Sequence, residues 1–407
     1  MRILIYEAMP DITRAEVILG IAAQHIEQGH IVFLLLDEEV YLLSRNHIKH
    51  PHAVNCLNII RAKIAPSKIP FYVTPASKSL KKLFYKKPDK NTLRKIQEYK
   101  CSHYQEILKS FKPDEVIIWN GLLDYQKEFI RLAQTYNPKI RFHFLEAGWF
   151  PQKGHYYHDS KGVNAASSIA EHPPKKLSQK ETKDIERWKN CYRKKHGNYN
   201  ICDKGYYFIP LQLESDTNIT LFSPFQTMEN FLKWILKNSD SKIPLIVRPH
   251  PLDHIEKIHL KKLSPRITID SSTPLQKLIA ESKIVIGINS TVLLESLIYD
   301  KPTVALGRGI FQSSKAIHLQ DVKQPIPKEL DFYHVYREYQ NAFLHQLRLL
   351  QHQLPTFKDV QPLLDGIPIE KSTRYSKFHQ KISVLKILLK QYSNKTYTKL
   401  SKYLHIL

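Results

Sequence analysis

Cysteine and long apolar runs are scarce in this sequence. Four cysteines occur among 407 residues, and they form neither a CxxC pair nor a cluster with histidines. Neither a zinc site nor a disulfide framework is indicated, and a reducing compartment suits such a chain. A membrane-spanning helix needs about 18 consecutive apolar residues, and no run in this sequence is that long. The apolar run Ile3–Tyr6 near the start is too short for a signal peptide. We expect a cytoplasmic protein, either soluble or bound only to the surface of the inner membrane.

Acidic residues are also few relative to basic ones. Lys and Arg total 61 against 38 Asp and Glu, a formal charge of +23. This excess predicts an anionic partner, which composition leaves open: a nucleotide donor, an acidic glycolipid, an anionic membrane or nucleic acid. The basic residues are spread along the chain and accompany no RNP, zinc-finger or helix-turn-helix signature. Nucleic-acid binding therefore stays a lesser alternative.

In two stretches of the sequence, short apolar runs typical of strands alternate with segments of helical spacing. A chain of 407 residues is long enough to form two hydrophobic cores. The first stretch predicts strands at Ile3–Tyr6, Ile31–Leu36, Glu115–Trp119 and Ile140–Leu145, with helices at Arg14–Gln28 and around Tyr125–Tyr136. The second predicts strands at Tyr206–Ile209, Ile219–Phe222, Pro244–Val247, Ile267–Ile269, Ile284–Ile288 and Thr303–Leu306, with helices at Gln226–Lys237, Pro274–Glu281 and Val292–Tyr299. Each alternation predicts a parallel α/β sheet, whose ligands bind beyond the carboxyl ends of its strands.

The remaining segments are less regular. Residues 153–205 are polar and rich in lysine, which predicts a loop or linker, with a helix over part of it as the alternative. After Phe311 the strand signals stop, and Tyr333–Gln351 and Ser376–Leu407 have helical spacing. The last of these is basic and amphipathic, so it is either a helix that lies on anionic lipid or an ordinary packing helix.

Two carboxylates follow the strand expected at Ile140–Leu145. Glu146 stands at the end of this strand, where a carboxylate can take a proton from an attacking hydroxyl. Asp159 supplies a second acid on the same segment, and glycosyl chemistry commonly uses such a pair. His158 and Asn164 lie beside it and offer hydrogen bonds and a stacking face to a sugar. A plain polar loop is the alternative explanation for all four residues.

Three sites follow strands of the second stretch. Gln212, Asp216 and Ser223 can hold a donor or acceptor, or form a hydrogen-bonded turn. Arg248 and His250 stand in the string RPHP, in which two prolines fix the backbone, so they form either an anion site or a structural cap of the strand.

The third site is the string Asn289-Ser290-Thr291 between a strand and a helix. Hydroxyl and amide groups at a helix start suit a phosphate, although they also cap helices that bind nothing. Together with the preceding sites it predicts a nucleotide-sugar site.

Four strings carry a family resemblance: EAGWFPQKGHYYHDSKGVN, FIPLQLESDTNITLFSPF, RPHP and GINSTVLLESLIYDKPTVALG. In this order they resemble the KpsC/KpsS/LipB-type capsule polysaccharide proteins over about residues 110–310. The resemblance implies a GT-B fold, in which two Rossmann-like domains face a central cleft, followed by C-terminal helices. It divides the chain into an acceptor domain with the catalytic carboxylates (1–200), a domain that binds the CMP-sugar (201–355) and a basic helical segment (356–407).

The resemblance also implies a function, the retaining transfer of Kdo from CMP-Kdo to a saccharide or lipid-linked acceptor of a bacterial capsule or lipopolysaccharide. No metal or other cofactor is expected. Asp159 would be the nucleophile and Glu146 the acid/base, and Ala147 stands where the family often has another acid. The donor would contact Arg248, His250, Pro251, Asn289, Ser290, Thr291 and Ser223. The substrate would also contact Gln212, Asp216, Asn164 and His158.

Other functions fit the same pattern. A transferase of this fold can use CMP-sialic acid or a UDP-sugar as its donor. An inactive scaffold in a capsule-assembly complex is a further alternative, although the chain keeps the histidine, the hydroxyl pair and both carboxylates.

Overall fold

The computed structural model describes residues 1–7, 12–36, 53–55, 101–102, 104–253, 257–327 and 332–353. The chain divides into two compact units: unit 1 is Met1–Leu145 with Gln353–Leu407, and unit 2 is Glu146–His352. The sequence-based boundary at residue 200 falls within unit 2, between a helix and the first strand of its sheet. The basic segment expected at 356–407, with its amphipathic helix, lies outside the described residues.

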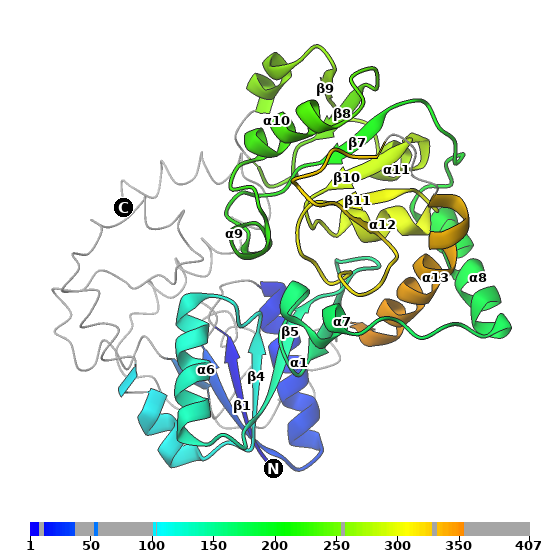
Figure 1. Cartoon of the computed structure of the whole chain (residues 1–407). Helices are drawn as coiled ribbons and strands as arrows, with labels where there is room; N and C mark the ends of the chain where they lie inside the picture. The colour runs from blue at the N-terminus through cyan, green and yellow to red at the C-terminus, as the bar shows by residue number, and fades with distance from the viewer. Residues whose placement is uncertain are drawn as a thin grey trace, which may run out of the picture. The chain divides into compact units, whose positions relative to one another are not determined.

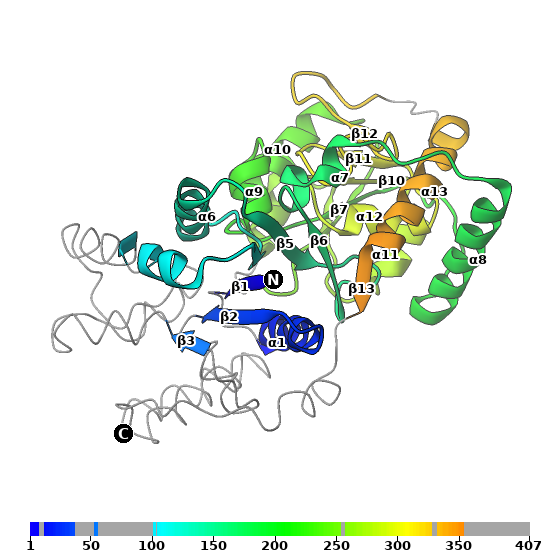
Figure 2. The ribbon, with the colours of Figure 1, turned by 90° about the horizontal axis from the view of Figure 1, so that it is seen from below.

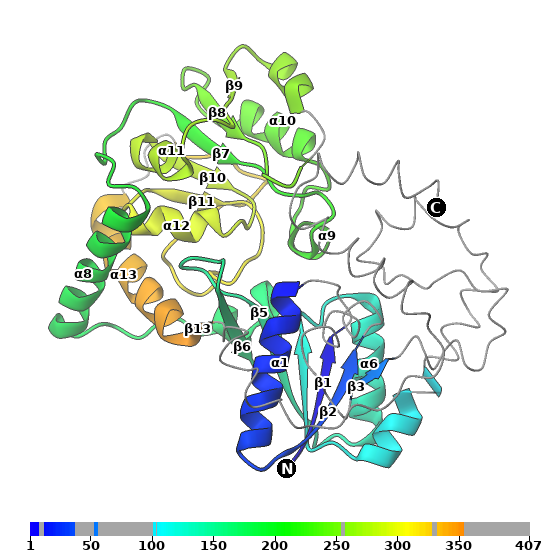
Figure 3. The same cartoon turned by 180° about the vertical axis from the view of Figure 1, so that it is seen from behind.

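Unit 1 contains a parallel sheet in the order β3-β2-β1-β4-β5. Its strands are β1 (Arg2–Glu7), β2 (Ile31–Leu36), β3 (Ala53–Asn55), β4 (Glu115–Trp119) and β5 (Arg141–Ala147). Helix α1 (Ile12–Glu27) and helix α6 (Asp124–Tyr136) cover opposite faces of this sheet, as Figures 1 and 3 show. All five residues of β4 are buried, which is typical of a parallel strand covered on both faces. The four strands predicted for this half are confirmed, whereas β3 was not predicted.

Unit 2 contains a six-stranded sheet in the order β12-β11-β10-β7-β8-β9, with parallel pairing. The strands are β7 (Tyr207–Pro210), β8 (Leu245–Arg248), β9 (Ile267–Ile269), β10 (Ile284–Gly287), β11 (Thr303–Ala305) and β12 (His318–Leu319). The chain enters at the middle strand, builds one side of the sheet and then returns to build the other. This is the Rossmann order, and its topological switch point lies between β7 and β10. The predicted α/β class is thereby confirmed.

The helices of unit 2 connect these strands and cover the sheet. They are α7 (Ser168–Glu171), α8 (Gln179–His196), α9 (Thr217–Phe222), α10 (Met228–Asn238), α11 (Leu275–Glu281), α12 (Val292–Ile298) and α13 (Phe332–Leu350), with 3₁₀ helices η2 (Asn164–Ala166) and η3 (Lys257–Leu263). Two further short strands, β6 (His155–Asp159) and β13 (Gln351–Gln353), neighbour each other.

The strand predicted at Ile219–Phe222 is wrong, because these residues form helix α9. Asp216 caps this helix by accepting the backbone N–H of Asn218 at 2.7 Å, and only Ile219 is buried. The β-branched residues of the string TNIT therefore gave a strand signal that a local cap overrides. In the lysine-rich linker zone the helical alternative is confirmed, since α8 begins at a capping box of Ser178 and Glu181.

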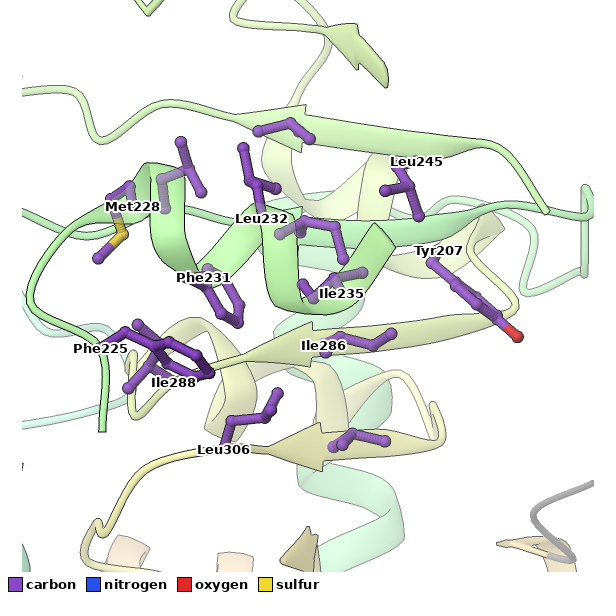
Figure 4. Packing of buried hydrophobic residues seen from close by; sticks show 14 of the residues in the cluster. Tyr207, Phe225, Met228, Phe231, Leu232, Ile235, Leu245, Ile286, Ile288 and Leu306 are labelled. Atoms are coloured by element: carbon purple, nitrogen blue, oxygen red, sulfur yellow. The ribbon is translucent and has the colours of Figure 1, made fainter. Parts of the chain in front are cut away.

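Helix α10 forms the core on one face of the unit 2 sheet. Its side chains Met228, Phe231, Leu232 and Ile235 recur at helical spacing and are at most 1% exposed. Figure 4 shows them directed at the sheet, where Ile286 and other strand residues meet them. Each such burial contributes about 1.5–3 kcal/mol, so this core fixes the strand ends that carry the site.

Helices α8 and α13 lie side by side in Figures 1 and 2, and both contact α12. The buried Lys189 of α8 donates to Asp300, which follows α12, and to Asn341 of α13 at 3.0 Å. A buried ammonium group is tolerated only with such partners. This anchoring leaves the opposite face of α8 exposed.

Candidate active site

The switch point of the unit 2 sheet is held together by two buried amide side chains. Gln212, after β7, donates its amide to Asn289 Oδ1 (3.0 Å), and the backbone N–H of Asn289, after β10, donates to Gln212 Oε1 (3.2 Å). The Asn289 Nδ2 group donates to the carbonyl oxygens of Asn218 (2.9 Å) and Arg308 (3.0 Å). Because all the hydrogens of Asn289 are used within the protein, its geometry suits the positioning of the neighbouring residues rather than a direct contact with a ligand.

Ser290 and Thr291 follow this amide pair and open α12, at the place between strand and helix that the sequence predicts. Ser290 Oγ accepts the backbone N–H of Val292 (3.2 Å), and its carbonyl accepts that of Leu293 (3.0 Å). Among the described residues, the backbone N–H groups of Ser290 and Thr291 and the Thr291 hydroxyl have no hydrogen-bond partner. Three donors at the carboxyl edge of the sheet are thus available to an anion.

His250 is half-buried in a turn after β8. Its carbonyl accepts the backbone N–H of Asp253 (2.9 Å), and its Nδ1 accepts that of Leu252 (3.1 Å). Since Nδ1 is an acceptor, the ring proton is on Nε2. Burial lowers the pKa of His250, although the charges of Asp216 and Asp253 oppose the shift. The ring is therefore neutral at pH 7, with an Nε2–H group as a donor.

Arg248 and Pro251, which belong to the same RPHP string, have structural roles. The guanidinium of Arg248 donates to the carbonyl of Thr273, and the carbonyl of Arg248 accepts the N–H of Leu211 (2.8 Å). Pro251 is exposed and fixes the backbone next to His250. Arg248 thus brings its charge to the sheet edge while it ties the end of β8 to the loop after β9.

Helix α9 carries a candidate at each end. One carboxylate oxygen of the exposed Asp216 caps the helix, and the other has no hydrogen-bond partner among the described residues. Ser223, by contrast, donates to the carbonyl of Phe225 (2.7 Å) and accepts its N–H (2.9 Å). Asp216 is therefore available to a substrate near His250, whereas the Ser223 hydroxyl closes a turn.

Asp159 ends β6, and the residue is only 5% exposed. One oxygen accepts the backbone N–H groups of Lys161 (2.7 Å) and Gly162 (3.1 Å). The other accepts the N–H of Ser168 (3.0 Å) and the Ser168 hydroxyl. Both oxygens are occupied, so this geometry suits the holding of the loop between β6 and α7 better than attack on a substrate.

Glu146 is partly exposed at the end of β5, and its Oε1 accepts the neighbouring N–H of Ala147 (3.0 Å). The fully buried Tyr157 lies close enough to feel this charge: burial, then Glu146 and also Asp159, raise the pKa of its phenol. The phenol oxygen accepts the N–H of Asn164 (2.9 Å). Tyr157 therefore stays protonated and joins β6 to η2, which packs against α9.

His158 points away from this group, because successive side chains of a strand face opposite sides. Its exposed ring stacks on His352 at 5.2 Å with an interplanar angle of 15°. The structure therefore does not bring His158 together with Asp159 and Glu146. It does bring Gln212, Asn289, Ser290 and Thr291 together, with Asn218 of α9 and Arg308 joined to them by hydrogen bonds.

Arg308 is a residue of this edge that the sequence analysis missed. It stands between Gly307 and Gly309 after β11, is exposed, and accepts the hydrogen bond from Asn289 noted above. A basic residue between two glycines directly after an apolar run was the available signal. The apolar run Thr303–Leu306 predicts the strand but does not by itself point to the residue that follows it.

Comparisons with known proteins agree with the resemblance read from the sequence. The profile of the family described as "Capsule polysaccharide biosynthesis protein" matches residues 175–340. Protein FixF of Sinorhizobium fredii is 27% identical over 218 residues, 50% of this chain and 52% of FixF. The capsule polysaccharide export protein KpsS of Escherichia coli is 26% identical over 125 residues, 28% of this chain and 32% of KpsS. The alignments thus span a third to a half of these relatives.

Among solved structures, the "beta Kdo 2,7 transferase" of Thermosulfurimonas dismutans KpsC matches with a TM-score of 0.47 and 17% identity, over 66% of this chain and 90% of that chain. The fold and the site define a class of protein with a Rossmann-type sheet and free hydrogen-bond donors at its carboxyl edge. Within that class, the chain is similar to the KpsS- and LipB-type capsule polysaccharide proteins over the matched residues. The described residues include no helix long and apolar enough to cross a membrane.

Proposed function

We propose that this protein is a GT-B glycosyltransferase of bacterial surface polysaccharide biosynthesis, and that its donor is a CMP-linked sugar acid, with CMP-Kdo as the first candidate. One observation carries the proposal: the free donors of Ser290 and Thr291 lie at the switch point of a Rossmann-type sheet. Phosphates bind at such strand-to-helix junctions because backbone N–H groups point at them. The names of the similar proteins include a capsule export protein, a capsule modification protein and a Kdo transferase, and they favour a role in surface polysaccharide biosynthesis.

The donor phosphate would bind to the N–H groups of Ser290 and Thr291 and to the Thr291 hydroxyl. His250 would add its Nε2–H group. The departing CMP gains one negative charge on a single phosphate. The neutral donors named above and the guanidinium of Arg248 can stabilise this charge. This mechanism calls for no metal ion and no other cofactor.

For transfer with retention we propose two displacements, and we assign the nucleophile to Asp216 in place of Asp159, whose oxygens are occupied. In the first, an oxygen of Asp216 bonds to the anomeric carbon while the carbon–oxygen bond to the phosphate breaks and CMP leaves. In the second, the acceptor oxygen bonds to the anomeric carbon and the Asp216 oxygen leaves. Glu146 takes the proton of the acceptor hydroxyl.

The acceptor is proposed to be a saccharide or a lipid-linked saccharide, and the protein to work at an anionic membrane surface. The exposed face of α8 supplies a basic stripe at helical spacing, formed by Lys180, Lys183, Arg187 and Lys194. Each basic residue near an anionic membrane contributes about 1 kcal/mol at low salt. The proposed contact would thus involve this exposed face of α8.

A donor panel tests the proposal. CMP-Kdo generated in situ, CMP-sialic acid and a UDP-sugar are each incubated with the protein and a synthetic glycolipid acceptor, and nucleotide release and product mass are measured. We expect CMP release and a product one sugar acid larger. Thr291→Val should weaken CMP binding by about tenfold, since it removes one hydrogen bond to a charged group. Thr135→Val, on an exposed position of α6, is the control. Release of UDP alone would contradict the CMP donor.

A further inference from the structure

Arg308 offers an unpaired guanidinium at the edge where the donor phosphate is proposed to bind. No carboxylate or other hydrogen-bond acceptor engages this side chain among the described residues. Its described contact is with the ring of Phe222, whose centroid lies 5.3 Å from the central guanidinium carbon. Stacking on an aromatic ring leaves the N–H groups at the rim of the guanidinium free to bind a ligand.

The backbone holds Arg308 in place from both sides. Its N–H donates to the carbonyl of Phe222 (2.9 Å), and its carbonyl accepts the amide of Asn289 (3.0 Å). A Cβ atom on Gly307 would come within 2.6 Å of the Ile288 side chain and 3.1 Å of the Phe222 carbonyl oxygen. The loop therefore fits closely against the ends of α9 and β10. Asn289 is also the residue directly before Ser290, so Arg308 is joined to the proposed phosphate site through one side chain.

We propose that Arg308 binds the carboxylate of the donor sugar and thereby selects sugar acids over neutral sugars. The inference rests on the proposed function. In a CMP-linked ulosonic acid the anomeric carbon carries both the carboxylate and the bond to the phosphate oxygen, so a protein that binds the phosphate has the carboxylate close by. The planar fork of an arginine matches a carboxylate with two parallel hydrogen bonds.

The neighbouring basic side chains leave this role to Arg308. Arg248 donates to the carbonyl of Thr273, and His250 is neutral at pH 7 because burial lowers its pKa. A neutral sugar would leave the Arg308 guanidinium without its counterion, and an unmet polar interaction of this kind discriminates strongly between substrates.

The test separates binding of the nucleotide from binding of the sugar acid. The KM for CMP-Kdo generated in situ and the inhibition constant of free CMP are measured for the wild type, Arg308→Met, Arg308→Lys and the control Arg131→Met, an exposed arginine of α6. Arg308→Met should raise the KM for CMP-Kdo about 10- to 100-fold, the cost of lost hydrogen bonds to a charged group, and leave CMP inhibition unchanged. The KM of Arg308→Lys should lie between those of the wild type and Arg308→Met, because lysine keeps the positive charge but cannot form two parallel hydrogen bonds to a carboxylate.

Two results would overturn the inference while leaving the proposed function intact. One is an unchanged KM for CMP-Kdo in Arg308→Met. The other is an equal loss for CMP-Kdo and free CMP, which would place Arg308 on the phosphate. If the wild type releases CMP from no sugar-acid donor, the proposed function fails and the inference falls with it. Circular dichroism and the melting temperature of each variant identify a loss that comes from misfolding.

Discussion

Replacement of Asp159 and Asp216 by asparagine tests the proposal that the first carboxylate is structural and the second catalytic. Asp159 accepts three backbone N–H groups and one hydroxyl, from Lys161, Gly162 and Ser168, with 5% of the residue exposed. In Asp159→Asn one acceptor becomes a donor and the charge is lost. Hydrogen bonds to a charged group contribute about 1.5–3 kcal/mol each, and the Ser168 hydroxyl can rotate to accept from the new amide.

We therefore expect Asp159→Asn to lower the free energy of unfolding by about 2–3 kcal/mol. For a unit of this size each kcal/mol shifts the melting temperature by about 2–4 °C, so the shift is about 4–12 °C. Turnover per folded molecule should fall less than tenfold. Asp216→Asn should behave in the opposite way. Its free energy of unfolding should stay within about 0.5 kcal/mol of the wild-type value, because the residue is exposed and asparagine also caps helices. Its turnover should fall about a thousandfold or more, because the proposed nucleophile is lost.

Urea unfolding followed by circular dichroism gives the stabilities, and CMP release below the melting temperature gives the turnover. Trapping of a glycosyl-enzyme by mass spectrometry identifies the nucleophile directly. The reasoning is refuted if Asp159→Asn keeps its stability and loses turnover while Asp216→Asn stays active. A covalent sugar on Asp159 would refute it equally.

Four further predictions concern the same edge of the sheet and α8. His250→Gln should keep most of the CMP affinity, since its amide replaces the Nε2–H group, whereas His250→Ala should lose about tenfold by calorimetry. Because burial lowers the pKa of His250 in the folded protein, the unfolded chain binds more protons as the pH falls below about 6.5, and the wild type loses stability. The melting temperature of the wild type should therefore fall relative to that of His250→Gln below that pH; a constant difference would contradict this. Asn289→Ala should lower the free energy of unfolding in urea by about 2–4 kcal/mol, because it leaves buried Gln212 without its partner. Flotation with anionic liposomes at low salt should recover the wild type but much less of Lys183→Glu/Arg187→Glu; equal recovery would exclude the α8 face.

Much of the fold could be predicted because buried parallel strands consist of apolar runs. EVIIW and KIVIGI leave little choice of structure, and the runs Tyr206–Ile209 and Thr303–Leu306 agree with β7 and β11 within a residue. Helix α9 has only six residues and one buried side chain. The spacing of its apolar residues therefore cannot distinguish a helix from a strand, which is why a strand was predicted there. Strand β12 has two residues and no apolar run of its own.

The site could be predicted only to the level of residue types at strand ends. Parallel topology brings Gln212, Asn289 and Ser290 together, and the sequence order was enough to expect this. Which atoms remain free depends on partners that are distant in the sequence or on local geometry. Ser223 and Asp159 have attractive side chains whose polar atoms are occupied, and no pattern of letters distinguishes Asp159 from Asp216.

The four hydrogen bonds of Asn289 and Gln212 have a consequence for engineering. They join the ends of β7 and β10, the backbone of α9 and the loop that carries Arg308, so these pieces move as one body. A chimaera that imports a single one of these loops from a relative would break these hydrogen bonds and weaken the proposed nucleotide binding, even where every residue proposed to contact the ligand is kept. Exchange of donor specificity between relatives therefore requires transplanting all four segments as a set.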